Sequence, residues 1–438
     1  MKIQLKSESE LRKLGIDLTK AISSPLSQSI IKSLKKGEEE DVLANQVLSS
    51  CGQDGLTTFY YLLNLLNKNS LLIYKTALID WIPIGESPPP DFQTLEGTYR
   101  ISPFAILRMK DNCFVMETPL YPVRINLTHH ETLRLLDFFR KPSPISEVFS
   151  HFSHLVKEEV EKTLSLLQQS KFLTSDAPDS IEKQWEPHDL YFHSRTRLGR
   201  HDSLFGGHFP FRGIIPAPTS KKNYPSSEVF PLKRPDAQLP LSLEDAIETR
   251  KSIREHAEIP LSSDQLGEFL FRCARVKESF FHHDEELSKR PYPGGGARYE
   301  LEIYPVIYKC EGLQKGVYHY DPFEHCLRNL SDLNENAEKL LSDASHSAKK
   351  KEYPQILFVV SARFQRVSWK YRSMAYALIL KNLGALYQTM YLVATAMGLA
   401  PCALGGGNSD LFCKVMRTNY LEEASIGEFI LGSRSSSV

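Results

Sequence analysis

The chain has 438 residues, of which 41% are hydrophobic and 24% are charged, a composition typical of a folded protein with two or three domains. Its 53 lysines and arginines balance 53 aspartates and glutamates, so the zero net charge gives no basic footprint for nucleic acid or an anionic membrane. The seven cysteines are scattered without a C-x-x-C pair, which indicates free thiols in a reducing, cytoplasmic compartment rather than a disulfide scaffold or a zinc site.

Targeting and membrane signals are weak. The opening MKIQLKSESELRK lacks the apolar core of a signal peptide. The longest apolar stretch, residues 371–404, contains Lys381, Asn382 and Gln388, which favours a buried helix over a membrane span. We therefore expect no membrane partner.

Residues 1–180 form two successive blocks of short helical patterns and strand-like segments. In the first block, helical patterns cover residues 26–37, 41–50 and 56–69. A strand-like segment follows at residues 71–79, and the SPPP run at residues 87–90 ends the block. In the second block, extended segments with a hairpin turn at Asp111-Asn112 precede three helical patterns, at residues 130–139, 144–152 and 158–173. The repeat predicts two winged-helix-like units, residues 1–90 and 91–180. Neutral charge disfavours DNA, so we expect a peptide laid along an exposed strand edge.

Residues 181–240 are rich in proline, glycine and serine and show no helical periodicity, which predicts a linker that wraps a surface. Three histidines, His188, His193 and His201, fall in it. A metal site would need cysteine or carboxylate partners that the segment lacks, so ordinary polar residues on a linker are the favoured interpretation. We expect no metal.

From residue 241 to 438 helical and strand patterns alternate, which predicts one α+β or α/β domain of about 200 residues. Helices are expected at residues 241–256 and 262–276, strands at 301–310 and 354–364, a hairpin-like piece at 312–322, and a long helix opened by Lys370-Tyr371. A short helix at 411–421 and a final strand at 427–433 complete the pattern. The HHDEE run at residues 282–286 has metal-ligand residue types but no helical frame, so we expect a solvated charged loop.

Two motifs in this domain could hold a ligand. Arg250, Ser252 and Arg254 could bind a phosphate dianion through charge-assisted hydrogen bonds, although solvated arginines at a helix end would look the same. Pro293, Gly294, Gly295 and Gly296 form a loop almost without side chains just before a strand, which would let backbone approach a ligand more closely than a plain turn needs.

Three further features could take part in chemistry. Lys370 could act as a general base if burial or a neighbouring cation lowers its pKa, and Tyr371 could donate or relay a proton; the alternative is an ordinary lysine at a helix N-terminus next to a half-buried tyrosine. Gly405 and Gly406 could present backbone N–H groups to a ring atom. Arg434 could meet a phosphate at the end of the last strand, or lie in a disordered tail.

The order of these motifs resembles a known family. R-x-S-x-R, RPYPGGGARYELEIY, Lys-Tyr, G-x-x-x-Q-x-x-Y-L-x-A-x-A-x-G-L and a glycine turn occur in the azoline dehydrogenases of the FMN-dependent nitroreductase superfamily, and the segment from Trp369 to Phe412 looks closest to the oxidases of cyanobactin pathways. These enzymes oxidise thiazolines and oxazolines in ribosomally made peptides to thiazoles and oxazoles. The resemblance covers roughly residues 185–438; the earlier region resembles the tandem peptide-recognition units of stand-alone members.

The resemblance implies a fold, a cofactor and partners. The fold would be a mixed sheet flanked by helices, in a homodimer with FMN at the interface, acting on an azoline-containing precursor peptide. Arg250, Ser252 and Arg254 would bind the FMN phosphate and ribityl chain. The Pro293–Gly296 loop would touch the flavin, that of the partner subunit. Gly405 and Gly406 would lie near flavin N5 and O4.

Lys370 and Tyr371 match the family's catalytic pair, with Lys370 expected to remove or relay the ring proton and dioxygen expected to reoxidise the flavin. The chain departs from many relatives at Arg298 and Glu300, where they read G-G-A-L-Y-P, and at Ala377 and Asn382, where they carry an Arg and a Glu. Two other functions stay open: an NAD(P)H-dependent nitro or quinone reductase on the same fold, and a non-enzymatic peptide-binding scaffold.

Overall fold

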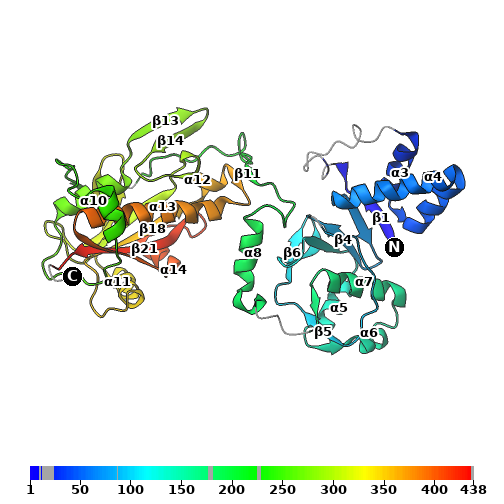
Figure 1. Cartoon of the computed structure of the whole chain (residues 1–438). Helices are drawn as coiled ribbons and strands as arrows, with labels where there is room; N and C mark the ends of the chain where they lie inside the picture. The colour runs from blue at the N-terminus through cyan, green and yellow to red at the C-terminus, as the bar shows by residue number, and fades with distance from the viewer. Residues whose placement is uncertain (9–10, 12–23, 86, 176–180, 224–227, 436–438) are drawn as a thin grey trace. The chain divides into compact units, whose positions relative to one another are not determined.

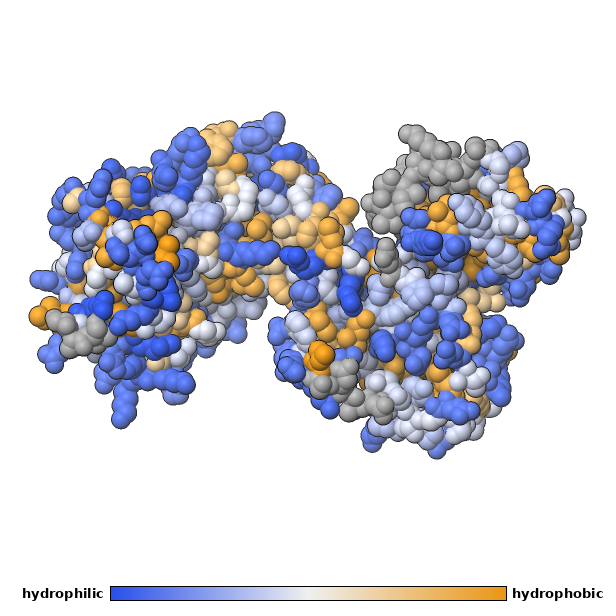
Figure 2. All heavy atoms as spheres, in the orientation of Figure 1, coloured by the Kyte–Doolittle hydropathy of each residue, from blue (hydrophilic) through white to orange (hydrophobic). Residues whose placement is uncertain are grey.

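The computed structural model describes residues 1–8, 11, 24–85, 87–175, 181–223 and 228–435, shown in Figure 1. It divides into two compact units, Met1–Leu204 and Phe205–Val438. The division falls inside the segment predicted to be a linker. The last residues of the predicted tail, 436–438, lie outside the described residues. On the face seen in Figure 2, hydrophilic and hydrophobic residues are interspersed over both units.

The first unit begins with helices whose ends follow from local sequence. Helix α3 (Pro25–Lys36) starts where the Ser24 side chain accepts a hydrogen bond from the Ser27 N–H, and it ends at Gly37, which has a positive φ of 80°. Helix α4 (Glu40–Lys68) joins the next two predicted helices across a kink at Gly52. The single strand expected at residues 71–79 is instead a pair of antiparallel strands, β3 (Leu72–Lys75) and β4 (Ile79–Pro83).

The second half of this unit follows the predicted order of strands and then helices. Asp111 and Asn112 both have positive φ values, 49° and 63°, and form the predicted hairpin turn. The remaining elements are β5 (Thr98–Ile101), β6 (Ile106–Lys110), β7 (Cys113–Glu117), β8 (Val123–Leu127), α5 (Glu131–Phe138), β9 (Ser143–Pro144), α6 (Ile145–His151), α7 (Lys157–Gln169) and β10 (Leu173–Thr174).

One antiparallel sheet runs through the whole first unit. Its order is β2-β1-β3-β4-β8-β7-β6, with β1 at Lys2–Leu5 and β2 at Glu38–Glu39. Because β4 pairs with β8, the two predicted repeats share this sheet and one hydrophobic core. Strand β6 forms one edge of the sheet.

The predicted linker is more structured than its composition indicates. Residues Pro187–Arg195 form helix α8, which begins with a proline at its first turn, so the expected absence of helix there is wrong. Gly206–Gly207 forms strand β11 and Val229–Pro231 forms strand β12, which joins the main sheet of the second unit. Proline and glycine here mark element ends rather than a chain without structure.

The second unit is a three-layer sandwich. Its sheet has the order β12-β17-β16-β15-β18-β21-β20, and every strand pair described in it is antiparallel, so the predicted mixed sheet is antiparallel in this part of the chain. The strands after β12 are β15 (Leu301–Ile307), β16 (Gly316–Asp321), β17 (Cys326–Asp332), β18 (Ile356–Arg363), β20 (Leu399–Leu404) and β21 (Glu423–Ser433).

Alternating side chains assign each face of the sheet to a different set of helices. In β18, Phe358 and Val360 pack in the core formed with α10 (Ser263–Ala274) and α13 (Ala375–Ala396), while Val359 packs with α11 (Glu335–Ser347) and α14 (Ser409–Met416). The shorter elements are α9 (Leu243–Thr249), β13 (Glu278–His282), β14 (Glu285–Lys289), α12 (Phe364–Ser368) and β19 (Tyr371–Arg372).

The structure also bears on the HHDEE run, the cysteines, membrane spanning and metal binding. The HHDEE run is not a solvated loop: it forms the turn and strand ends of the β13–β14 hairpin, and Glu285 is buried. All seven cysteines lie in the described residues and are free. In the parts of the chain that the structure describes, no helix is long and apolar enough to cross a membrane, and no group of three or more His, Cys, Asp or Glu could hold a metal.

Candidate active site

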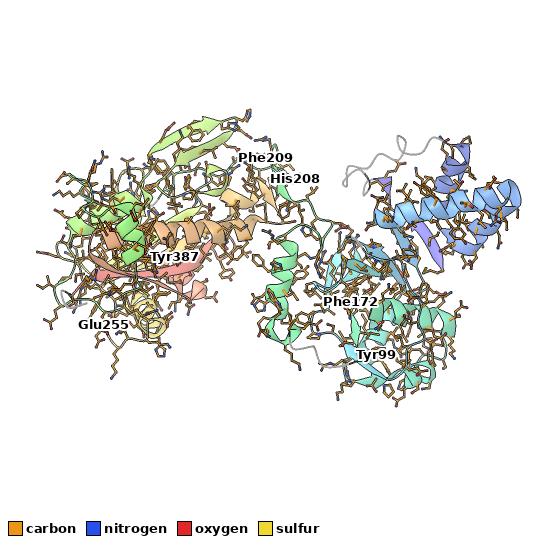
Figure 3. The ribbon with its side chains drawn as sticks, viewed as in Figure 1. Tyr99, Phe172, His208, Phe209, Glu255 and Tyr387 are labelled. Carbon is orange, nitrogen blue, oxygen red and sulfur yellow. The ribbon has the colours of Figure 1, made fainter. Side chains whose placement is uncertain are left out.

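Lys370 and Tyr371 stand between α12 and α13, and their backbone is held by the segment before β12. Strand β19 pairs with β11, and the Lys370 carbonyl accepts hydrogen bonds from the N–H groups of His208 and Phe209, both at 3.0 Å (Figure 3). Helix α13 begins only at Ala375, so the Lys-Tyr pair precedes the long helix instead of opening it. The pair is therefore fixed by a strand pairing that no helical pattern could predict.

The glycine loop meets this pair within the same chain. A methyl group placed on Gly296 would lie 2.4 Å from the Tyr371 hydroxyl and 3.2 Å from Lys370 Nζ. Gly296 has a φ of 63°, and Ala297 and Tyr299 also have positive φ values, 56° and 44°. Such strained backbone persists only where its surroundings hold it, and it is common at functional sites.

The rest of the loop is held against α13. The Gly295 N–H donates to Asn382 Oδ1 at 3.0 Å, and Asn382 Nδ2 donates to Glu300 Oε1 at 2.8 Å. A side chain on Gly295 would collide with Leu378, whose atoms lie 2.6 Å from the added carbon. Pro293 is exposed and Gly294 is half-buried. The glycines are thus needed for close packing on the helix, and two of the positions that depart from the family pattern, 300 and 382, contact each other directly.

The surroundings of Lys370 lower the pKa of its ammonium group. Burial lowers the pKa of the Lys370 ammonium, and the guanidinium groups of Arg298 and Arg212 lower it further. Burial raises the pKa of the Tyr371 phenol, with Arg298 opposing the change. At neutral pH this arrangement combines a neutral phenol with an amine that gives up its proton more readily than an exposed lysine, as proton transfer requires.

A second cluster of predicted residues gathers around Tyr391, further along α13. Ser252 Oγ lies 2.8 Å from the Tyr391 hydroxyl, and the Arg250 guanidinium carbon lies 5.1 Å from the centre of the Tyr391 ring. Ile253 is buried and its N–H donates to the Pro401 carbonyl at 2.8 Å, which leaves Arg254 exposed on the other side. The three polar side chains thus lie at the surface with an apolar anchor between them.

The glycine turn after β20 is tied to the same cluster. The Ala403 N–H donates to the Tyr391 hydroxyl at 2.8 Å, two residues before Gly405. Gly405 and Gly406 are exposed, and a side chain on either would meet nothing within 4 Å, so their backbone is open to a ligand. Arg434 follows Ser433, whose carbonyl accepts from the Ala257 N–H at 3.0 Å, which brings it near the end of the Arg250–Arg254 segment.

A buried carboxyl group stands beside this turn. A methyl group on Gly407 would lie 2.0 Å from Glu428 Oε1, and burial raises the pKa of Glu428 to about 7. Neither Tyr391 nor Glu428 was predicted from the sequence. Tyr391 falls within the family pattern as an unassigned position, whereas Glu428 sits in a strand whose apolar neighbours gave no signal.

The two clusters lie at different places along α13. Gly295 contacts Leu378 and Asn382 in the first turns, while Ser252 contacts Tyr391. At ~1.5 Å rise per residue, the helix advances about 20 Å between positions 378 and 391. Tyr387 lies between them on α13, whereas His208 and Phe209 lie toward its start (Figure 3). Within one chain, the predicted site residues therefore form two groups: the Lys370 group, with Tyr371 and the Gly294–Gly296 loop, and the Arg250 group, with Ser252, Tyr391 and the Gly405–Gly407 turn.

Comparison with known families identifies two regions. Residues 247–432 match the nitroreductase family, and residues 99–202 match the family described as cyanobactin oxidase ThcOx. The nitroreductase match covers the Lys370 group and the Arg250 group and ends before Arg434. The cyanobactin oxidase match lies within the first unit.

Three curated relatives are each 28% identical over part of the chain. A protein of Methanocaldococcus jannaschii named for the nitroreductase family, MJ1384, aligns over 39% of this chain and 83% of its own length. The microcin B17-processing protein McbC of Escherichia coli aligns over 35% of this chain and 56% of its own length. The trifolitoxin-processing protein TfxB of Rhizobium leguminosarum bv. trifolii aligns over 26% of this chain and 31% of its own length.

These matches confirm the resemblance predicted from the motifs and support an oxidoreductase with a nitroreductase-like C-terminal fold. The winged-helix form of the two N-terminal repeats stays a prediction. The chain combines a cyanobactin-oxidase-like region at residues 99–202 with a nitroreductase-family region at residues 247–432.

Proposed function

We propose that the protein oxidises thiazoline and oxazoline rings in a ribosomally made peptide to thiazoles and oxazoles, with FMN as the electron acceptor. The observation that carries the proposal is that Gly296 lies so close to Lys370 Nζ and the Tyr371 hydroxyl that an added Cβ would fall 3.2 and 2.4 Å from them, in a chain that matches the cyanobactin oxidase and nitroreductase families. A base with a lowered pKa beside a strained, side-chain-free loop suits proton removal next to a flat ligand.

The Arg250 group fits the cofactor's phosphate and ring edge. Arg250, Ser252 and Arg254 offer guanidinium and hydroxyl donors, and Gly405 and Gly406 offer exposed backbone N–H groups with free space around them. Arg434 would add a further cation near the phosphate. These residues would hold FMN, and the cofactor would supply a two-electron acceptor for the oxidation, with dioxygen as the final oxidant.

A homodimer would bring the two groups together. The Arg250 group and the Lys370 group of one chain lie about 20 Å apart along α13. A second copy could place its Pro293–Gly296 loop and its Lys370 against the Arg250 group of the first copy. Each site would then contain one group from each copy. This is consistent with FMN bound at a subunit interface. Size-exclusion chromatography with light scattering should give a dimer.

Lys370 has the role of the base. Oxidation of an azoline breaks the Cα–H bond and one C–H bond at the neighbouring ring carbon, Cβ, so that one proton and one hydride leave and the ring becomes aromatic. Lys370 Nζ would take or relay the proton, while the Tyr371 hydroxyl, which faces the same glycine, would orient the ring.

The test uses FMN-loaded protein and a thiazoline peptide. Lys370→Ala should lose azole formation while keeping its flavin absorbance, and Lys370→Arg should be equally inactive because a guanidinium stays protonated. Lys381→Ala, which removes an exposed lysine on α13, is the matched control. Unchanged azole formation in Lys370→Ala would refute the assigned role.

We propose that the first unit binds the precursor peptide along the edge of its sheet. Strand β6 is an edge strand that exposes Leu107 and Met109, and Phe114 on the adjoining β7 is also exposed. An edge strand with exposed apolar side chains can add a peptide strand through main-chain hydrogen bonds. Leu107→Asp with Met109→Asp should raise KM for the full-length peptide. The control, Val156→Asp, changes another exposed apolar residue of the same unit, at the N-cap of α7.

A reductase function has one observation in its favour. The relative MJ1384 is named for the nitroreductase family, and the match covers most of its length. The alternative predicts steady NADPH consumption with nitroaromatic compounds and no change in an azoline peptide. A purified protein without flavin absorbance would instead favour the non-enzymatic scaffold.

A further inference from the structure

The β13–β14 hairpin places two consecutive carboxylates next to the Lys370 group. Asp284 lies in the hairpin turn and is half-exposed, whereas Glu285, at the start of β14, is 1% exposed. His283, just before them, has a positive φ of 55°, which lets the chain reverse. The HHDEE run, which its composition predicts to be solvated, is therefore partly buried.

Each carboxylate holds one arginine. Glu285 forms an ion pair with Arg298, whose side chain is completely buried, and Asp284 Oδ1 lies 3.2 Å from the Arg212 guanidinium. Glu285 also approaches Arg212, at 3.9 Å. One hairpin therefore anchors two cations that come from separate parts of the chain, one before β12 and one after the glycine loop.

Both arginines lie against aromatic rings that surround Lys370. The Arg212 guanidinium carbon lies 4.0 Å from the centre of the Phe209 ring, and Lys370 Nζ lies 5.2 Å from the same centre. The guanidinium carbons of Arg298 and Arg212 lie 5.5 and 5.8 Å from the Trp369 ring, which is fixed by its Nε1–H donating to the Ile215 carbonyl at 2.8 Å. The two cations are thereby positioned beside the lysine that follows Trp369.

The charged groups around Lys370 are arranged in two layers. Burial, Arg298 and Arg212, in that order, lower the pKa of the lysine. Asp284 and Glu285 form their ion pairs with the two arginines, and Tyr371 is a neutral phenol whose pKa burial raises. The two carboxylates are therefore placed to hold the cations.

We propose that the Asp284-Glu285 turn is a positioning element that holds the Arg212 and Arg298 guanidiniums beside Lys370, where their positive charge disfavours protonation of the amine. The inference rests on the proposed function, in which Lys370 takes the substrate proton, and adds the groups that prepare it. It assigns a role to a hairpin outside the groups described above.

The test measures the amine itself, without substrate. The full-length protein is treated with acetic anhydride over a range of pH at low ionic strength, where exposed charges are screened least, and acetylation of Lys370 is quantified by peptide mass spectrometry. Only the neutral amine reacts, so the midpoint of the profile reports the protonation of Lys370.

Removing a cation and removing the carboxylate that holds it should move this midpoint in the same direction. Arg212→Gln removes a repelling charge, so the midpoint should rise and acetylation at pH below it should slow several-fold. Asp284→Asn releases the Arg212 guanidinium from its anchor, so the midpoint should also rise, by less than in Arg212→Gln. Both side chains are about half-exposed, so both variants should fold. Arg372→Gln, an exposed arginine two residues from Lys370, should leave the midpoint unchanged.

The buried pair gives a second, larger comparison. Arg298→Met should raise the midpoint more than Arg212→Gln, and Arg298→Lys, which keeps the charge, should restore it. Equal midpoints in wild type, Arg212→Gln and Asp284→Asn, or a midpoint in Asp284→Asn below that of the wild type, would overturn the proposal. Shifts of the expected signs in a protein whose Lys370→Ala variant still forms azoles would support this electrostatic role and refute the proposed function.

Discussion

Replacing Gly296 with alanine should displace the Tyr371 hydroxyl, and its effect on catalysis can be measured apart from its effect on stability. The added methyl carbon would lie 2.4 Å from the Tyr371 hydroxyl, whereas ordinary contacts begin at 3.4 Å, so the hydroxyl must move by about 1 Å. A shift of ~1 Å in a positioning group can cost about 100-fold in rate. We therefore expect kcat for azoline oxidation to fall by about two orders of magnitude.

The same substitution also strains the backbone, and a matched variant isolates that cost. Alanine at a φ of 63° costs about 1–2 kcal/mol. Gly398 has a φ of 66° and has nothing within 4 Å of an added methyl group, so Gly398→Ala carries a similar backbone cost without the contact. Urea unfolding should show comparable losses of stability in the two variants.

Activity should then distinguish them. The rate of azole formation is measured by mass spectrometry under saturating peptide, with flavin content checked by absorbance. Gly398→Ala should keep most of its activity. If Gly296→Ala retains wild-type kcat, or if both variants lose activity equally, the Gly296 loop does not position Tyr371 and Lys370 for the reaction.

Three other outcomes follow from the second cluster and the peptide edge. Arg250→Ala should weaken FMN binding at least about tenfold, since charge-assisted hydrogen bonds contribute about 1.5–3 kcal/mol. A fluorescence titration measures this, with Arg234→Ala, which removes an exposed arginine just after β12, as the control. Glu428 has a pKa raised from 4.5 to about 7, so its protonated form stabilises the fold at low pH, and that stability is lost as pH rises through about 7. Between about pH 4.5 and 8 the wild type should lose roughly 3 kcal/mol relative to Glu428→Gln, measured by urea unfolding, and equal pH dependence in both would contradict the burial argument. Leu107→Asp with Met109→Asp should raise KM for the full-length peptide but not for a short thiazoline peptide, and equal effects on both would argue against strand addition at β6.

Helices with clear apolar periodicity and end signals could be predicted from the sequence alone. The structure contains α3 ending at Gly37, α10 with its Ser262 capping box and the Asp111-Asn112 hairpin turn, each close to its predicted place. Local patterns determine these elements, because caps, glycines and turn residues act within a few positions.

Features that depend on distant pairing could not be predicted this way. Strand β19 exists because Tyr371 and Arg372 pair with Gly207 and Gly206, more than a hundred residues away, and two-residue strands leave no periodicity. Helix α8 was missed because its hydrophobic pattern is short and stands among prolines and histidines. Glu285 was assigned to solvent because its partner, Arg298, comes from another part of the chain.

For the candidate site, residue types and their order suggested the members, and the structure adds how they are grouped. Lys370, Tyr371 and Gly296 come together, while their roles in the reaction stay a prediction. The separation of the Arg250 group along α13 and its link through Tyr391 follow only from the packing of the helix on the sheet. Sequence order carries no information about which end of a helix a loop will meet.

Incubation of the purified protein with a thiazoline-containing precursor peptide tests the central claim most directly. Under air and without NAD(P)H, the peptide mass should fall by about 2 Da for each ring oxidised, with the yellow flavin unchanged at the end of the reaction. An unchanged peptide mass from a flavin-loaded protein that instead consumes NADPH with nitroaromatic compounds would contradict the account.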